Sequence, residues 1–165
     1  MKFTLSAAAA AALLLASPAL AAGDVAKGEK AFKQCQTCHV VVAPDGTVLA
    51  GRKMKTGPNL YGVFGRVAGT YPDFAYGPDM VAAGAKGLVW DEAQFTAYTA
   101  DPSKFLQAYL GDPKAKGKMA FKVKTEAEAA DLYAYLTSLF PAPAAAPVDP
   151  AAAPVDPAAA PAPSN

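Results

Sequence analysis

Apolar residues recur three and four positions apart in several short segments of this chain, and this spacing predicts amphipathic helices. The first helix is expected to begin after a cap at Asp24 and to run into Cys35. The last helix is expected to begin at a capping box formed by Thr125 and Glu128 and to end before Pro141. One face of this last helix is apolar, and it carries Ala129, Leu132, Leu136 and Leu139, with Tyr135 beside them.

Three further helix starts lie between these two segments. Pro78 suits the first turn of a short helix that ends near Gly84. Asp91 begins a second capping box, before a helix that carries Phe95. Asp101 and the proline after it begin another helix, with the apolar residues Phe105, Leu106, Tyr109 and Leu110. Because the chain shows little strand signal, the pattern predicts an all-α fold.

Residues 40–77 show no sustained periodicity, and they include seven glycines from Gly46 to Gly77. A long irregular stretch normally argues against a compact fold. It becomes reasonable if this part of the chain wraps a flat ligand, because the ligand then supplies part of the core. We therefore expect helices and long loops arranged around a bound group.

The two ends of the chain differ from the middle in composition. Residues 1–21 have a basic start, an Ala/Leu-rich run and a small-x-small pattern at Ala19–Ala21, which predicts a secretory signal peptide that is cleaved. Residues 141–165 are almost entirely Ala and Pro, so they are expected to form a disordered tail. The folded domain is therefore expected to span residues 22–140, which is a typical length for one domain.

The charge of the chain is nearly balanced, with 15 Lys and Arg against 14 Asp and Glu. This balance is not typical of a nucleic-acid-binding protein, and we expect no nucleic-acid partner. One region is nevertheless basic, because six lysines fall close together with Asp112 as the single acid among them: Lys104, Lys114, Lys116, Lys118, Lys122 and Lys124. This surface is either an ordinary solvated loop or a docking surface.

Both cysteines and the single histidine of the chain lie together in the sequence Cys35-Gln36-Thr37-Cys38-His39. C-x-x-C-H is the motif at which c-type haem is attached. Each thiol can add to one vinyl group of a porphyrin, and the adjacent imidazole can then bind the iron. A thioredoxin-like disulfide would instead need a neighbouring strand–helix–strand pattern. A structural zinc site would need four ligands, and the motif offers three.

A low-spin redox haem needs a second axial ligand, and with no further histidine a thioether is the best choice. Met54, Met80 and Met119 remain once the signal peptide has been removed. Met80 can be an ordinary core residue, whereas Met119 lies in an open, lysine-rich loop where a methionine has no obvious packing role. The pattern therefore favours Met119, with the other two as alternatives.

Several ordered stretches of the domain resemble class I cytochromes c, most closely the bacterial cytochrome c2 type. The similarity covers nearly all of residues 23–140, and it is carried by Gly23–Phe32, Lys55–Arg66, Trp90–Glu92, Lys118–Phe121 and Asp131–Leu136. The resemblance implies the class I cytochrome c fold around one covalent haem c, with His39 and Met119 as axial iron ligands. It does not extend to the Ala/Pro tail.

The resemblance also implies roles for residues around the haem. The carbonyl of Pro58 accepts a hydrogen bond from His39 and so orients its ring. Arg66, Tyr76 and Trp90 hold a haem propionate. Tyr98 lies near the Met119 sulfur, and Phe121 covers the haem near its exposed edge. Gly28 and Phe32 meet Leu132 and Tyr135 where the first and last helices cross.

The function implied by the resemblance is electron transport rather than an enzymatic reaction. The expected protein is a soluble, periplasmic, monomeric carrier that moves one electron at a time from a cytochrome bc1 complex to a photosynthetic reaction centre or a terminal cytochrome oxidase. The basic surface is expected to dock on acidic patches of these partners. Two other classes remain as alternatives, a thiol oxidoreductase and a haem enzyme of the peroxidase or gas-binding type.

Overall fold

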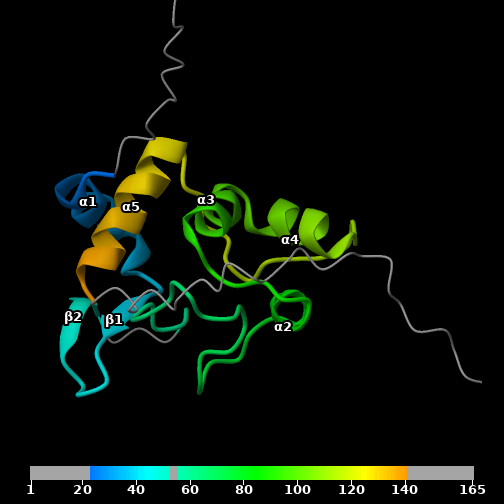
Figure 1. Ribbon diagram of the computed structural model, residues 1–165, viewed down its shortest axis with the longest axis horizontal. Coiled ribbons are helices and arrows are strands. Elements are labelled where there is room, and N and C mark those ends of the chain that lie inside the picture. The colour runs from blue at the N-terminus through cyan, green and yellow to red at the C-terminus, as the bar shows by residue number, and fades with distance from the viewer. Residues whose placement is uncertain (1–22, 53–55, 141–165) are drawn as a thin grey trace, which may run out of the picture.

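The computed structural model describes residues 23–52 and 56–140 (Figure 1). The predicted signal peptide at 1–21 and the predicted tail at 141–165 lie outside the described residues, as do Met54, Lys53 and Lys55. The described elements are α1 (Val25–Cys35), β1 (Val40–Val42), β2 (Val48–Gly51), α2 (Pro78–Ala85), α3 (Glu92–Ala100), α4 (Pro102–Leu110) and α5 (Glu126–Ser138). No helix within these described ranges has the length and apolar character needed to cross a membrane.

The helices begin where their capping residues predict. The Asp24 carboxylate accepts a hydrogen bond from the backbone N–H of Lys27 at 3.0 Å. The same arrangement starts α3 at Asp91 and α4 at Asp101, and the Thr125 hydroxyl accepts the N–H of Glu128 at the start of α5. Each cap satisfies a backbone donor that the first turn of a helix otherwise leaves without a partner. The short local sequences therefore determine where the helices start.

A small antiparallel sheet is the one regular element that the sequence pattern did not predict. Val40 pairs with Gly51, Val41 with Ala50 and Val42 with Val48, with an irregularity after Val41. The turn between the strands is closed by the N–H of Ala43, which donates to Thr47 O at 2.9 Å. Strands of three and four residues are too short to show an alternating pattern, although the sequence Pro44-Asp45-Gly46 is a turn signal.

The first and last helices cross closely, as the resemblance implied. Figure 1 shows α1 and α5 side by side, and the two helices are in contact. A Cβ atom built on Gly28 would lie 1.9 Å from Asp131 O and 2.7 Å from Tyr135 Cβ. The ring centroids of Phe32 and Tyr135 are 5.5 Å apart at this crossing. Glycine is therefore required at position 28, because no side chain fits between the two helices.

Buried side chains form two clusters, and the candidate site lies between them. The first cluster joins α1 and α5 to the loop after β2, and it includes Phe32, Phe64 and Leu136. The second joins α2 and α4 through residues such as Met80 and Leu106. Trp90 packs against both clusters.

Replacing Gly28 with Ala should destabilise the protein, because the added methyl group must push α1 away from α5. We expect a loss of about 1–3 kcal/mol in the free energy of unfolding, which is the usual cost of overpacking a core. Urea unfolding followed by circular dichroism measures this loss. Lys33→Ala, on the exposed part of the same helix, is the control and should change stability by less than about 0.5 kcal/mol. Equal effects of the two substitutions would contradict the close packing at Gly28.

Candidate functional site

A largely apolar cavity of about 370 Å³ lies between the two clusters. Its walls come from the end of α1, the loop at 56–67, the loop at 74–77, helices α2, α3 and α5, and the loop at 118–123. Cavities of this size and character are typical of cofactor sites. Met54, an alternative iron ligand, lies outside the described residues, but the assigned site residues all line this cavity: Cys35, Cys38, His39, Pro58, Arg66, Tyr76, Trp90, Tyr98, Met119 and Phe121.

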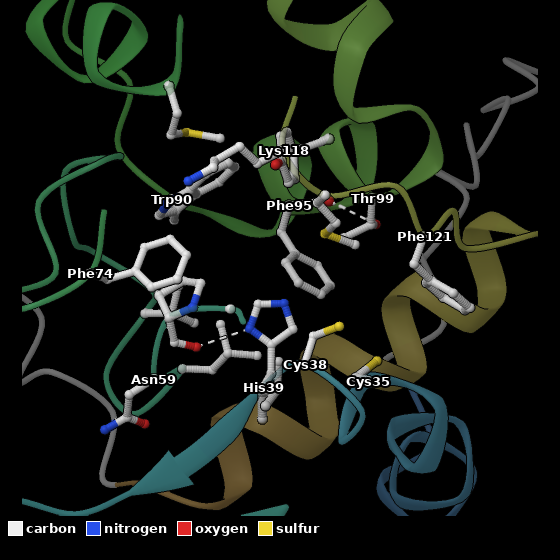
Figure 2. Close-up of a pocket in the computed structure, with 18 of the residues that line it drawn as sticks. Cys35, Cys38, His39, Asn59, Phe74, Trp90, Phe95, Thr99, Lys118 and Phe121 are labelled. Carbon is white, nitrogen blue, oxygen red and sulfur yellow. Dashed lines mark hydrogen bonds between the residues drawn. The ribbon is translucent and has the colours of Figure 1, made fainter. Parts of the chain in front are cut away.

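The two cysteines and the histidine reach the cavity through a tight turn at the end of α1. The backbone N–H groups of Cys38 and His39 both donate to Cys35 O, at 3.0 and 2.8 Å. This turn brings both thiols and the imidazole to one side of the cavity, as Figure 2 shows. The two thiols are not bonded to each other. Burial raises the pKa of the Cys35 thiol to about 11, with a smaller contribution from Glu128.

The imidazole of His39 is held in one orientation. Its Nδ1 lies 2.9 Å from Pro58 O, and because a carbonyl can only accept, Nδ1 must carry the proton. The other ring nitrogen, Nε2, is then left with a lone pair that can bind a metal ion. Burial lowers the pKa of His39, although the hydrogen bond to Pro58 acts in the opposite direction. The ring therefore favours the neutral form that iron ligation requires.

Two methionines of the described chain line the cavity. Met80 is 8 % exposed and packs within the second buried cluster, so its position is explained by the core alone. Met119 is partly exposed and belongs to neither buried cluster. Its loop enters the cavity from the segment between α4 and α5. A thioether that does not fill the core is available as a ligand.

Arg66 and Trp90 form a polar corner of the cavity. They are brought together by a short backbone pairing, in which Trp90 N–H donates to Arg66 O at 3.0 Å and Gly65 N–H donates to Trp90 O at 2.8 Å. The Arg66 guanidinium donates to the carbonyls of Asn59, Tyr61 and Gly62. Within the described residues no carboxylate lies within 4 Å of it. A half-buried cation without an acidic partner suits an anionic group of a ligand.

Tyr76 and Tyr98 are two phenols of the cavity wall. Burial raises the pKa of Tyr98 to about 12 and also raises the pKa of Tyr76, which Arg66 opposes. The Tyr98 ring packs edge-on against Trp90, with centroids 5.1 Å apart. Both hydroxyls therefore remain protonated and can donate hydrogen bonds near neutral pH.

Phe121 and two further residues complete the lining. Phe121 is 38 % exposed, so it lies where the cavity meets solvent. Phe95 and Thr99 also line the cavity (Figure 2), and the sequence analysis had not assigned them to the site. Thr99 is buried, and its hydroxyl donates to Phe95 O at 2.8 Å. The spacing of Phe95, Tyr98 and Thr99 on one helix face was the signal that could have revealed them.

The donor set of the cavity fits a c-type haem. Two thiols and a neutral imidazole occupy one side, a thioether is available from another segment, and aromatic and aliphatic side chains line the rest. Within the described ranges, no group of three or more His, Cys, Asp and Glu side chains could hold a metal ion.

Comparison with known proteins gives a consistent result. Cytochrome c2 of Cereibacter sphaeroides is 61 % identical over 138 residues, which cover 82 % of this chain and 95 % of the relative. Cytochrome c2 of Rhodobacter capsulatus is 54 % identical over 139 residues, which cover 84 % of this chain and 98 % of that protein. This chain belongs to the cytochrome c2 family. No family model matches the chain.

Solved structures agree with the family assignment. The structure of cytochrome c2 from Rhodobacter sphaeroides superposes with a TM-score of 0.69 at 62 % identity, and the match covers 70 % of this chain and 95 % of that one. The predicted helical class I cytochrome c fold is therefore confirmed, with the β1–β2 hairpin as an addition. Cytochrome c2 proteins are haem electron carriers with one covalently bound haem c, so the predicted cofactor is confirmed as well.

Replacing Gly57 with Ala should disturb the orientation of His39. An added Cβ would lie 2.6 Å from His39 Cε1, 2.7 Å from Nδ1 and 3.0 Å from Cys38 O. We expect a loss of stability of about 1–3 kcal/mol and faster solvent exchange of the Nδ1 proton. Chemical unfolding and proton NMR of the haem-loaded protein measure the two effects. Lys30→Ala, at an exposed position of α1 outside the cavity, should change neither, and an unperturbed Nδ1 proton in Gly57→Ala would contradict the steric argument.

Proposed function

We propose that this chain is a periplasmic carrier that moves single electrons between membrane complexes, through a haem attached at Cys35 and Cys38 and ligated by His39 and Met119. One observation carries the proposal: two thiols, a neutral imidazole and a thioether outside the buried clusters all line one apolar cavity. The family resemblance supports the same assignment, and the chemistry of each group is consistent with it.

Attachment of the haem requires no external oxidant. Each thiol adds across a vinyl group, so a carbon–sulfur bond forms and the thiol proton goes to the other vinyl carbon. The two cysteines are three positions apart and joined by the turn at Cys35 O, which suits two bonds to one flat group. The cysteines are then consumed by attachment, which argues against a thiol oxidoreductase.

When bound, the haem supplies one-electron ferric–ferrous chemistry at its iron. His39 contributes Nε2, held in place by the hydrogen bond from Nδ1 to Pro58 O. Met119 would contribute a neutral sulfur, and neutral thioether ligation favours a high reduction potential. With His39 and Met119 both bound to the iron, no position would remain there for oxygen or a substrate. This arrangement favours a carrier over a haem enzyme of the peroxidase or gas-binding type.

The surrounding residues bind and shield the group. Arg66, Tyr76 and Trp90 provide donors for a propionate, and Arg66 lacks any carboxylate partner within 4 Å among the described residues. Tyr98 provides a protonated phenol in the cavity that Met119 also lines. Phe121 covers the solvent-facing side, where electrons can pass to a partner without opening the cavity.

The expected partners are a cytochrome bc1 complex as electron donor and a photosynthetic reaction centre or a cytochrome oxidase as acceptor. The predicted signal peptide at 1–21 supports export to the periplasm, where the protein acts as a monomer. All six lysines of the basic surface are exposed, so their charges can attract acidic partners: Lys104, Lys114, Lys116, Lys118, Lys122 and Lys124. Lys122 also pairs with Asp101 at 2.6 Å, which weakens its contribution.

Replacing Met119 with Ala should lower the reduction potential and open the iron to added ligands. We expect a decrease on the order of 0.2 V, because axial ligands tune haem potentials over about 0.8 V. The weak near-infrared band from sulfur-to-ferric charge transfer should disappear, and the reduced protein should bind carbon monoxide. Redox titration and visible spectroscopy measure these changes.

The matched control is Met80→Leu, which removes the other thioether that lines the cavity among the described residues and nearly conserves its volume. This substitution should keep the band and the potential, with a stability cost below about 1.5 kcal/mol. An unchanged potential in Met119→Ala, or loss of the band in Met80→Leu, would refute Met119 as the ligand.

Replacing both Lys114 and Lys116 with Gln should slow electron exchange with membranes that contain a cytochrome bc1 complex. We expect about a two- to tenfold decrease in the second-order rate at low ionic strength, since steering raises association rates by about 10- to 1000-fold. The difference should shrink as salt rises, because salt screens exposed charges. Stopped-flow rates at several salt concentrations measure it. Lys27→Gln is the control, because the Lys27 side chain pairs with Asp24 outside the cavity. Electron-exchange rates that do not change with salt would contradict electrostatic steering.

A further inference from the structure

The loop that carries Met119 is held firmly on the side of α4. Ala115 is buried, and its carbonyl accepts a hydrogen bond from the Gln107 side chain at 3.2 Å. The N–H of Lys116 donates to an Asp79 carboxylate oxygen at 2.8 Å. The N–H of Gly117 donates to the Ser103 hydroxyl at 3.1 Å. Three successive residues are therefore tied to α2 and α4.

The loop is tied again just before α5 begins, this time to the end of α3. The N–H of Val123 donates to Thr99 O at 2.8 Å, and the Lys122 ammonium pairs with Asp101. Between these anchors, residues 119–121 make no backbone hydrogen bond to any other part of the described chain. The methionine therefore sits at the start of a short unsupported span. Its position depends on the residue immediately before it.

Lys118 directly precedes Met119, and its side chain reaches the loop at 74–77, which also lines the cavity. Its Nζ donates to Ala75 O at 2.6 Å and lies 5.8 Å from the centre of the Phe74 ring. Its stem passes over Gly77, where a built Cβ would lie 3.2 Å from Lys118 Cγ. Phe74 and Lys118 both line the cavity, as Figure 2 shows. The side chain thus joins the loop at 117–121 to the loop at 74–77.

We propose that Lys118 is a latch that keeps Met119 over the cavity, rather than a lysine that serves mainly to dock partners. This proposal rests on the ligand role of Met119 proposed above. An external ligand would reach the iron only if Met119 moved away, and a displacement of the loop that also carried Lys118 would strain the bond from its Nζ to Ala75 O. Lys118 is therefore a positioning residue, which acts on the iron through its neighbour.

The following variants separate the effect of the hydrogen bond from Lys118 to Ala75 O from the effect of the Lys118 charge. Lys118→Gln removes the charge and leaves a side chain too short to reach Ala75 O in the same way. Lys118→Arg keeps the charge and offers donors at similar reach. Lys114→Gln removes an equal charge from the same surface, at a lysine whose side chain forms no ion pair in the described part of the chain. Lys118 is exposed, so none of these changes should prevent folding.

The experiment is a titration of the haem-loaded ferric protein with imidazole, which binds the iron only when Met119 is displaced. Lys118→Gln should bind imidazole about two- to tenfold more tightly than the parent protein, the range expected for one lost hydrogen bond. Its near-infrared sulfur band should also disappear at a lower temperature. Lys114→Gln and Lys118→Arg should stay close to the parent in both measurements. A docking role alone would alter exchange rates with partners and leave the imidazole equilibrium unchanged.

Three results would overturn the latch. Lys118→Gln and Lys114→Gln could change the imidazole affinity equally, or Lys118→Gln could leave it unchanged. In the third case, Lys118→Arg would bind imidazole as tightly as Lys118→Gln does. Met119→Ala tells this failure apart from failure of the proposed function. If Met119→Ala binds imidazole far more tightly than the parent while Lys118→Gln matches Lys114→Gln, only the latch is wrong. If Met119→Ala binds imidazole no more tightly than the parent, the ligand assignment and the latch both fail.

Discussion

The pairing of residues 38–42 with residues 57–61 is the constraint on which the site depends. Gly57 N–H donates to Cys38 O and Leu60 N–H donates to Val40 O, both at 2.9 Å. The Asn59 side chain accepts from Val42 N–H and donates to Val42 O. His39 lies between these ties, so its bond to Pro58 O is one contact in a ladder. A ladder holds a ring more firmly than a single hydrogen bond can, because its members must break together.

The need to surround the cavity also explains why so much of the domain lacks regular secondary structure. A cavity bounded by two separate buried clusters needs walls at several distances and angles, and straight helices cannot supply all of them. Backbone hydrogen bonds join Gly65 and Arg66 to Trp90. Because Trp90 packs against both clusters, these bonds connect one cluster to the other. The covalent haem of the family provides apolar surface that both clusters can share. The loops are therefore built to surround a flat group and need no periodic pattern of their own.

Local chemistry accounts for most of what the sequence predicted correctly. The caps at Asp24, Asp91, Asp101 and Thr125 act within four residues, and the cysteine–histidine motif is contiguous, so both could be recognised from the sequence. The pairing of the two strands and the contact from Lys118 to Ala75 could not be recognised from the sequence. Each of these depends on a partner that the fold brings near, and a single sequence does not show which distant residues meet.

The lysines near Met119 show why composition alone cannot assign a role to a charge. Lys118 and Lys122 lie within the same basic run as Lys114 and Lys116, yet their ammonium groups contact Ala75 O and Asp101 within the fold. A lysine that steers partners works best when its ammonium group remains hydrated and free to meet an acidic patch, because steering acts before contact. A lysine that holds a loop must be ordered in one position, which costs side-chain entropy. One side chain serves both needs poorly, so a surface that must attract partners and also hold an iron ligand is better built from two sets of lysines.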